Sequence, residues 1–239
     1  KTARAYHGVA GTKGGAVGHR GEGTTPLLAW MPFYFLMWSE AHDEQLMSAQ
    51  IILTFPDQTS KTYPSGVTPL MIIEGLNAEA RSRTVALKVD GRPWDLHTPL
   101  TENGTVEPLS FDAPEGREVF RHSSSHLMAQ AVKRLFPGAK LAIGPAIEDG
   151  FYYDVDFDRP LTPEDLEKIE ATMHELAHAA FPIRRQELSK AEAIRFFRER
   201  GESYKIEIIE GIPDPTVSLY EQGDFVDLCE GPHLPTTAS

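Results

Sequence analysis

The sequence predicts an α+β fold built from two consecutive units. Residues 51–109 show the order strand, strand, helix, strand, strand, which is typical of a small unit with a mixed sheet. Beyond residue 112, helix-start signals alternate with short β-rich runs and with proline or glycine breaks. Helices and strands are therefore expected to be mixed there as well, and the chain shows no internal repeat.

Composition sets the first limits on function. The chain has 239 residues, of which 41% are hydrophobic, so it is long enough for one large or two small domains. Its single cysteine, Cys229, excludes an internal disulfide and is consistent with a reducing cytosol. With 23 basic and 35 acidic side chains the net charge is −12, so the overall field repels phosphate. Any nucleic-acid partner must therefore be bound by a local basic patch or a shaped pocket.

Residues 1–46 are predicted to be a disordered or extraneous extension, and the folded protein is predicted to begin at Met47. Residues 27–38 are strongly apolar, but a membrane-spanning helix needs about 20 apolar residues and this run contains Pro32. Basic residues before the run resemble a secretory signal, yet residues 39–44 would form a poor cleavage region. We expect no membrane association and a cytoplasmic location.

The first unit begins with a predicted hairpin. Residues 51–55 and 61–63 are β-rich and are separated by a turn at residues 56–58. Residues 84–89 form the next β-rich run, and shorter apolar segments follow as far as Leu109. These runs predict the strands of the mixed sheet.

The helix of the first unit is predicted from its start signal. Thr68 is a suitable N-cap, and Pro69 occupies the first helical position, where a missing N–H is tolerated. Apolar side chains then recur at helical spacing: Leu70, Ile73, Leu76 and Ala80. One helix is expected over this stretch.

The second unit is predicted to follow a linker at residues 112–116. Residues 119–136 have the pattern of a helix that is stopped by a proline and a glycine. Residues 141–147 and 151–157 are strand candidates on either side of a turn.

Two helices with explicit caps are predicted next. Thr162, followed by Pro163 and acidic residues, is a strong helix start. Ser189 and Glu192 form a capping box for another helix, which is predicted to stop at Gly201. Two further strands are predicted: residues 204–209 and residues 217–220.

The side chains most suited to chemistry form two pairs: His122 with His126, and Cys229 with His233. The members of each pair are four residues apart, which on a helix places both on one face. Three imidazoles and a thiolate match a tetrahedral zinc site. A zinc site, a metal-free catalytic cluster and an unrelated set are all compatible with the spacing alone. The small polar residues 123–125 and the turn at residues 231–232 do not suit a packed core, which favours a functional cluster.

Two further features have competing interpretations. Residues 174–178, HELAH, match the HExxH pattern of zinc proteases, in which two histidines bind zinc and the glutamate activates water. The longer pattern with a third histidine is absent and Pro182 ends the helix, so an amphipathic surface helix is the simpler interpretation. For Lys205, between a predicted helix and a predicted strand, the simpler interpretation is a side chain exposed to solvent. If it points into a cleft with the histidines, its ammonium could stabilise an oxyanion or move a proton.

Five separated strings carry a family resemblance: RHSSSHL at residues 121–127, AIGP at 142–145, GFYYD at 150–154, GESYK at 201–205 and DLCEGPH at 227–233. In this order they resemble the N-terminal half of bacterial threonyl-tRNA synthetases. The resemblance implies a ubiquitin-like β-grasp (TGS) domain over residues 47–111. It also implies an α+β tRNA-synthetase editing domain over residues 112–239.

The activity that this resemblance implies is hydrolysis of the ester in seryl-tRNA(Thr), the product of mischarging. Serine lacks one methyl group relative to threonine, and binding discriminates such a difference by only about 1–3 kcal/mol. A second site that rejects threonine by steric clash and accepts serine must therefore remove the error. The implied partners are the acceptor end of tRNA(Thr) carrying serine and the remainder of the synthetase.

The resemblance also implies which residues form the editing pocket. The implied catalytic residues are His122, His126, Lys205, Asp227, Cys229 and His233. Lys205 and one histidine would position or deprotonate water and stabilise charge, while Asp227 would orient the substrate amine or a neighbouring side chain. Tyr153 and Gly144 would shape the pocket.

The resemblance leaves the role of metal open. In the related alanyl branch the matching histidine and cysteine residues bind zinc, whereas the threonyl branch is treated as working without metal. No cofactor is therefore expected to be required for editing. Zn²⁺ stays possible at four residues: His122, His126, Cys229 and His233.

The chain stops where the family's editing domain continues, so this domain is expected to be truncated at its C-terminus. The motifs of the ligase core are absent from this sequence, and ATP and Mg²⁺ would be needed only with that core. Aminoacylation by this fragment alone is not expected. Two other functions stay open: a non-catalytic tRNA-binding or regulatory module, and a zinc-dependent hydrolase of another substrate.

Overall fold

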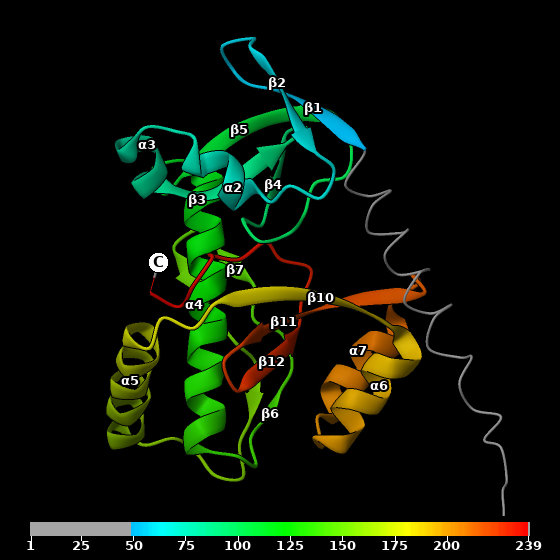
Figure 1. Ribbon diagram of the computed structural model, residues 1–239. Helices are drawn as coiled ribbons and strands as arrows, with labels where there is room; N and C mark the ends of the chain where they lie inside the picture. The colour runs from blue at the N-terminus through cyan, green and yellow to red at the C-terminus, as the bar shows by residue number, and fades with distance from the viewer. Residues whose placement is uncertain (1–48, 239) are drawn as a thin grey trace, which may run out of the picture. The chain divides into compact units, whose positions relative to one another are not determined.

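A computed structural model describes residues 49–238 of the chain. The extension predicted for residues 1–46, its apolar run and the start at Met47 lie outside the described residues. Within the described range the α+β class is confirmed, because helices alternate with strands that form several separate sheets (Figure 1). No helix in this range is long and apolar enough to cross a membrane.

A five-stranded sheet occupies residues 49–111, here called the five-stranded region. Its strands are β1 (Gln50–Thr54), β2 (Ser60–Pro64), β3 (Thr84–Val89), β4 (Arg92–Trp94) and β5 (Gly104–Ser110). They lie in the order β2-β1-β5-β3-β4, with β1 parallel to β5 and the other neighbours antiparallel. The predicted hairpin and the strand predicted at residues 84–89 are both confirmed.

Two short helices, α2 (Pro69–Glu74) and α3 (Ala78–Arg83), replace the single helix predicted after Thr68. Thr68 caps the first helix as predicted, but Asn77 starts a second one by accepting a hydrogen bond from the Ala80 N–H at 2.8 Å. The prediction of one helix was wrong because Asn77 is itself a strong N-cap. The core of this region lies between these elements: Ile51, Leu53, Val67, Ile72, Ile73, Leu87, Leu96, Leu100 and Val106.

The long helix α4 (Pro114–Leu135) opens the C-terminal region, residues 112–238 (Figure 1). The predicted start at residue 119 was too late, and most of the predicted linker at 112–116 is helical. Pro114 fits the first helical position. Gly116 lets the first turn approach β5, since a Cβ there would lie 2.0 Å from the Ser110 carbonyl oxygen.

The segment between α4 and α5 contains four strands of two residues each, where two longer strands were predicted. β6 (Lys140–Leu141) pairs with β9 (Val155–Asp156), and β7 (Ala146–Ile147) pairs with β8 (Gly150–Phe151). The prediction of continuous strands at 141–147 and 151–157 was therefore wrong. Pro145 has no N–H to donate, which interrupts regular pairing between the two ladders.

Helix starts predicted from capping residues are confirmed. Thr162 caps α5 (Pro163–His178) in a full capping box. Ser189 and Glu192 form the capping box of α6 (Lys190–Glu199). Gly201, the predicted stop, follows α6 with a φ of +73°, a conformation that favours glycine.

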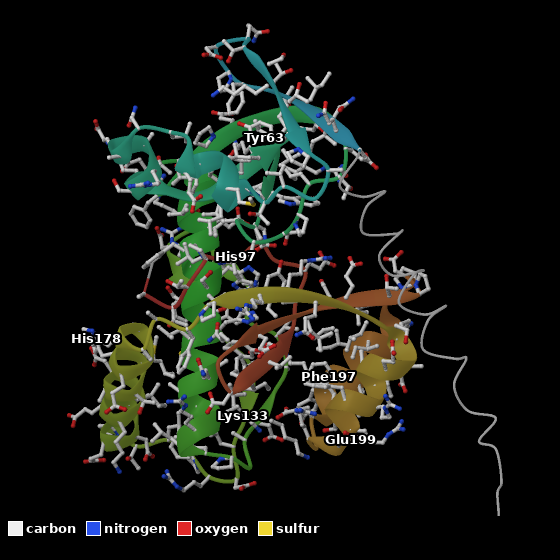
Figure 2. All side chains as sticks on the ribbon, viewed as in Figure 1. Tyr63, His97, Lys133, His178, Phe197 and Glu199 are labelled. Carbon is white, nitrogen blue, oxygen red and sulfur yellow. The ribbon has the colours of Figure 1, made fainter. Side chains whose placement is uncertain are left out.

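Residues 204–209 lie in helix α7 (Ser203–Gly211), so the strand predicted there was wrong. The alternation of apolar and charged residues imitates a strand, but Lys205 and Ile209, one helical turn apart, are both buried on one face. Ile209 packs in one cluster with Phe197 of α6, which Figure 2 labels. Tertiary packing has thus overridden the local pattern.

A three-stranded antiparallel sheet completes the C-terminal region. Its strands lie in the order β10 (Ile183–Ser189), β11 (Thr216–Gln222) and β12 (Phe225–Leu228). β11 contains the strand predicted at residues 217–220, whereas β10 and β12 were not predicted. Residues 229–234, here called the pocket loop, follow β12 and contain no helix, so Cys229 and His233 do not share a helical face.

Candidate active site

One cavity of about 450 Å³ brings together side chains that are far apart in the sequence. Its walls come from α4, the segment between β6 and β7, α7, the end of β12 and the pocket loop. The predicted site residues that line it are His122, His126, Gly144, Tyr153, Lys205, Asp227 and Cys229. His233 is almost completely buried at 1% exposure and lies behind the wall, in contact with Cys229.

Helix α4 positions the first two histidines. His122 and His126 are one turn apart, so both rings face the same side, and their centroids are 5.1 Å apart. His126 is buried against Tyr153, Phe225 and His233, whereas His122 is partly exposed to the cavity. Burial lowers the pKa of both rings, that of His126 the more strongly, which favours neutral imidazoles.

Cys229 lies between two imidazoles. Its Sγ is 3.2 Å from His122 Nε2 and 3.3 Å from His233 Nε2, and it accepts a hydrogen bond from the Gly231 N–H at 3.2 Å. Burial raises the pKa of the Cys229 thiol to about 12, and burial together with the neighbouring histidines lowers the pKa of His233. The cluster therefore stands as a neutral thiol among neutral imidazoles.

The same four residues fit a zinc ion. Nitrogen or sulfur atoms of His122, His126, Cys229 and His233 all lie within 4.8 Å of one another. Zinc–nitrogen and zinc–sulfur bond lengths place neighbouring tetrahedral ligands about 3.3–3.6 Å apart, close to the two sulfur–nitrogen distances found here. Ser123 Oγ lies 3.1 Å from the other ring nitrogen of His233, as an outer-shell partner would. With all four residues bound the site would be closed, while three residues and a water would polarise that water.

Lys205 and Asp227 form a buried ion pair beside the histidines. Lys205 Nζ lies 2.5 Å from Asp227 Oδ1, and the two side chains are 3% and 2% exposed. The ammonium also donates to the Ala142 carbonyl at 2.6 Å and lies 3.0 Å from the Tyr153 hydroxyl. Lys205 thus points into the cleft, which was the condition set for a chemical role.

Tyr153 completes this group by donating its hydroxyl hydrogen to Asp227 Oδ2. Burial, together with the Asp227 charge, raises the pKa of the Tyr153 phenol well above its ordinary value, so it stays protonated. Asp227 also accepts the Leu228 N–H at 2.8 Å. Both Asp227 oxygens thus have partners inside the protein, so this carboxylate orients Lys205 and Tyr153.

Gly144 has a steric reason to be glycine. A Cβ at this position would lie 2.1 Å from Cδ2 of the Tyr153 ring. The Gly144 carbonyl also accepts a hydrogen bond from Ser125 Oγ at 2.8 Å, which ties this wall of the cavity to α4. Gly144 and Tyr153 together shape the cavity wall.

The HELAH motif lies elsewhere. His174 and His178 are exposed on α5, where Figure 2 labels His178, and neither belongs to the metal-binding group found among the described residues. Asp95 and Tyr220 support the pocket loop but were not singled out in the sequence. Asp95 is 138 positions from its partner His233, and no local pattern marks such a contact.

Comparison with known proteins gives consistent matches. Residues 217–239 match the family described as "Threonyl and Alanyl tRNA synthetase second additional domain". The chain is 53% identical over 192 residues to the threonine-tRNA ligase of Symbiobacterium thermophilum, covering 80% of this chain and 30% of that protein. It is 52% identical over 189 residues to that of Citrifermentans bemidjiense, covering 79% and 30%. The chain thus spans about 30% of the length of the curated relatives it matches.

Proposed function

We propose that this chain is the N-terminal part of a threonine-tRNA ligase and that its cavity hydrolyses the ester of mischarged seryl-tRNA(Thr). One observation carries the proposal: the cavity joins a buried lysine–aspartate pair to imidazoles and a thiol, in a chain about half identical to threonine-tRNA ligases. Aminoacylation is not assigned to this part of the protein. A cytoplasmic location, where translation takes place, follows from the same proposal.

Residues 47–111 are assigned in this proposal to a TGS-type β-grasp domain and residues 112–239 to the editing domain. The strand order β2-β1-β5-β3-β4, with a central parallel pair, supports the first assignment. The family match at residues 217–239 supports the second. The partners are the acceptor end of tRNA(Thr) carrying serine and the remainder of the synthetase.

Proofreading is needed because one methyl group provides little discrimination. A pocket that merely binds threonine loses only about 1–3 kcal/mol when serine replaces it, so serine is sometimes attached. A second pocket can invert the selection by size, since it admits serine and excludes the larger side chain. A cavity of about 450 Å³ is large enough for a seryl ester with part of its adenosine.

The reaction is ester hydrolysis. Water adds to the carbonyl carbon, the bond to the ribose oxygen breaks, and the proton lost by water ends on that oxygen. His122 is the histidine best placed to accept the proton, because its ring is partly exposed at the cavity while that of His126 is buried.

Lys205 contributes through its charge. Its three neighbours, Ala142, Tyr153 and Asp227, occupy the ammonium hydrogens, so the group is held rigidly beside the cavity. A fixed cation in a site with little water stabilises negative charge that develops on the carbonyl oxygen. Asp227 keeps the ammonium in place and Tyr153 joins the two.

Deacylation of seryl-tRNA(Thr) and threonyl-tRNA(Thr) by the purified chain tests the proposal. Lys205→Met removes the charge, and Lys205→Met with Asp227→Asn removes both charges, so no unpaired ion remains buried. Both variants should lose hydrolysis of the seryl ester. Lys140→Met, at an exposed lysine of β6, is the matched control and should keep it. The wild-type chain should release serine and leave threonyl-tRNA intact.

A second candidate is a zinc-dependent hydrolase of another substrate, which the four clustered ligand atoms favour. Metal analysis and a chelator arm separate the two functions. Serine release that persists after chelation supports metal-free editing, and serine release that stops with chelation and returns with zinc supports zinc-dependent editing. A zinc-containing chain that releases no serine supports the second candidate. Binding of seryl-tRNA by a chain that contains no zinc and hydrolyses no ester would contradict both and indicate a binding module.

A further inference from the structure

Asp95 belongs to the five-stranded region, yet both of its carboxylate oxygens serve the C-terminal region. It directly follows β4 and is 9% exposed. Oδ1 accepts a hydrogen bond from the His233 N–H at 2.7 Å, and Oδ2 accepts one from the Tyr220 hydroxyl at 2.6 Å. Thr98 Oγ1, 3.2 Å from Oδ2, holds the carboxylate from its own side.

The pocket loop depends on such contacts because it lies outside helices and strands. Around His233, the Leu234 N–H donates to Ser123 Oγ at 2.9 Å, and the same oxygen lies 3.1 Å from His233 Nδ1. These bonds hold the ring and the residue after it. Asp95 alone among the described hydrogen bonds holds the His233 backbone N–H.

Tyr220 links the Asp95 carboxylate to the ring of His233. The two rings have centroids 4.5 Å apart, so the hydroxyl bonded to Asp95 positions a ring that packs on the imidazole. Gly231 lets the pocket loop pass over this tyrosine. Its φ is +77°, and a Cβ there would lie 1.9 Å from the Tyr220 hydroxyl oxygen.

The contact is also unusual electrostatically. Asp95 is a buried carboxylate that forms no ion pair with any lysine, arginine or histidine side chain in residues 49–238. Its charge is stabilised by hydrogen bonds, which are stronger when one partner is ionised. A buried carboxylate that accepts hydrogen bonds from the pocket loop and from β11 constrains both more than a neutral acceptor would.

We propose that Asp95 is a positioning residue of the pocket: by holding the His233 backbone N–H and the Tyr220 hydroxyl, it sets the position of the His233 imidazole relative to Cys229. The role in catalysis rests on the editing function proposed above. The five-stranded region then contributes to the chemistry of a cavity that it does not line. Other contacts accompany this one, including His97 Nε2 at 3.2 Å from the Pro235 carbonyl oxygen (Figure 2).

The test compares Asp95→Asn with Asp90→Asn in the full chain. Asparagine has the shape of aspartate, but an NH2 group replaces one of the two oxygens that accept from His233 and Tyr220, so one of these two donors loses its acceptor. Asp90 is a matched control because its carboxylate also accepts a backbone N–H, that of Thr105 at 2.7 Å, and is exposed within the same region. Tyr220→Phe removes the second hydrogen bond without changing Asp95.

Two measurements are needed. The first is the set of imidazole ¹⁵N chemical shifts in chain labelled at histidine, with the His233 signals assigned by their loss in His233→Gln. The second is kcat and KM for seryl-tRNA(Thr). Asp95→Asn and Tyr220→Phe should move the His233 shifts and lower kcat about tenfold or more, as expected for a misplaced group, while KM changes by less than about twofold. Asp90→Asn should change none of these.

The outcomes separate the two proposals. Unchanged His233 shifts in Asp95→Asn would overturn the positioning role, whatever the activity. Shifts spread over all histidines with a large fall in melting temperature would also overturn it, because Asp95 would then only hold the two regions together. If the wild-type chain does not hydrolyse seryl-tRNA, the editing function fails, while a selective His233 shift would still support the contact between Asp95 and the pocket loop.

Discussion

Lys205 Nζ and Asp227 Oδ1 lie 2.5 Å apart in an ion pair from which water is almost completely excluded. The lysine comes from helix α7 and the aspartate from strand β12, so the pair joins two of the elements that line the cavity. Burying two charges is costly unless they are paired and hydrogen-bonded, and here each partner has further hydrogen bonds.

The first prediction concerns the stability of this pair. Lys205→Met alone leaves the buried Asp227 carboxylate without its cation, and Asp227→Asn alone leaves the buried Lys205 ammonium without its anion. Each variant should lower the free energy of unfolding by about 3–5 kcal/mol. The double variant should be clearly more stable than the sum of the two losses predicts. Urea unfolding followed by circular dichroism measures all three. Simple additivity would show that the two charges do not interact, and exposed Lys140→Met should change stability little.

Gly144→Ala should disturb the cavity through Tyr153. The new methyl would lie 2.1 Å from the tyrosine ring, so the ring must move away from Lys205 and Asp227. We expect a stability loss of about 1–3 kcal/mol, typical of overpacking, together with slower deacylation. Gly211→Ala is the control, because a Cβ there meets no atom within 4 Å. Equal behaviour of the two variants in unfolding and deacylation assays would refute the steric argument.

Glu202 is expected to support Lys205 indirectly. Its carboxylate lies 2.6 Å from Lys133 Nζ and accepts the Leu141 N–H at 3.3 Å, so the start of α7 is tied to the strand next to Ala142. Glu202→Gln should cost about 1–3 kcal/mol, the usual range for a bond to a charged group, and should lower deacylation. Glu199→Gln, exposed at the end of α6, should leave thermal unfolding and activity unchanged. If Glu202→Gln changed neither stability nor deacylation, the position of α7 would depend on packing alone.

Asp165 should make stability depend on pH. Its hydrogen bonds from the Arg159 side chain, and then from the Thr162 backbone, hold the pKa of this carboxyl well below its usual range. A carboxyl with a depressed folded-state pKa stabilises the protein above its unfolded-state pKa of about 3.9, and this contribution is lost as pH falls toward the folded-state value.

Asp165→Asn should therefore lower the urea midpoint at pH 7. The difference in urea midpoint between this variant and the wild-type chain should decrease as pH falls below about 4. Asp149→Asn, at an exposed turn, should show no such difference at any pH. A difference in urea midpoint between Asp165→Asn and the wild-type chain that stays constant from pH 7 to pH 3 would contradict the depressed pKa. Unfolding curves at several pH values provide the comparison.

Local signals in the sequence determined much of the fold. Thr162, Ser189 and Gly201 start and stop helices through bonds to residues only a few positions away, so their patterns are sufficient. The strand at residues 84–89 and the hairpin before it were predicted for the same reason. The two ligand-type pairs, His122 with His126 and Cys229 with His233, were also visible as spacing alone.

Tertiary structure alone decided the rest, because the deciding contacts join residues far apart in the chain. Residues 204–209 alternate like a strand, yet burial of Lys205 and Ile209 on one face makes them helical. Asp227 orients Lys205 and Tyr153, and these partners meet only in the folded chain. Asp95 reaches His233 across 138 positions, and such a contact arises from the packing of two regions that no local pattern encodes.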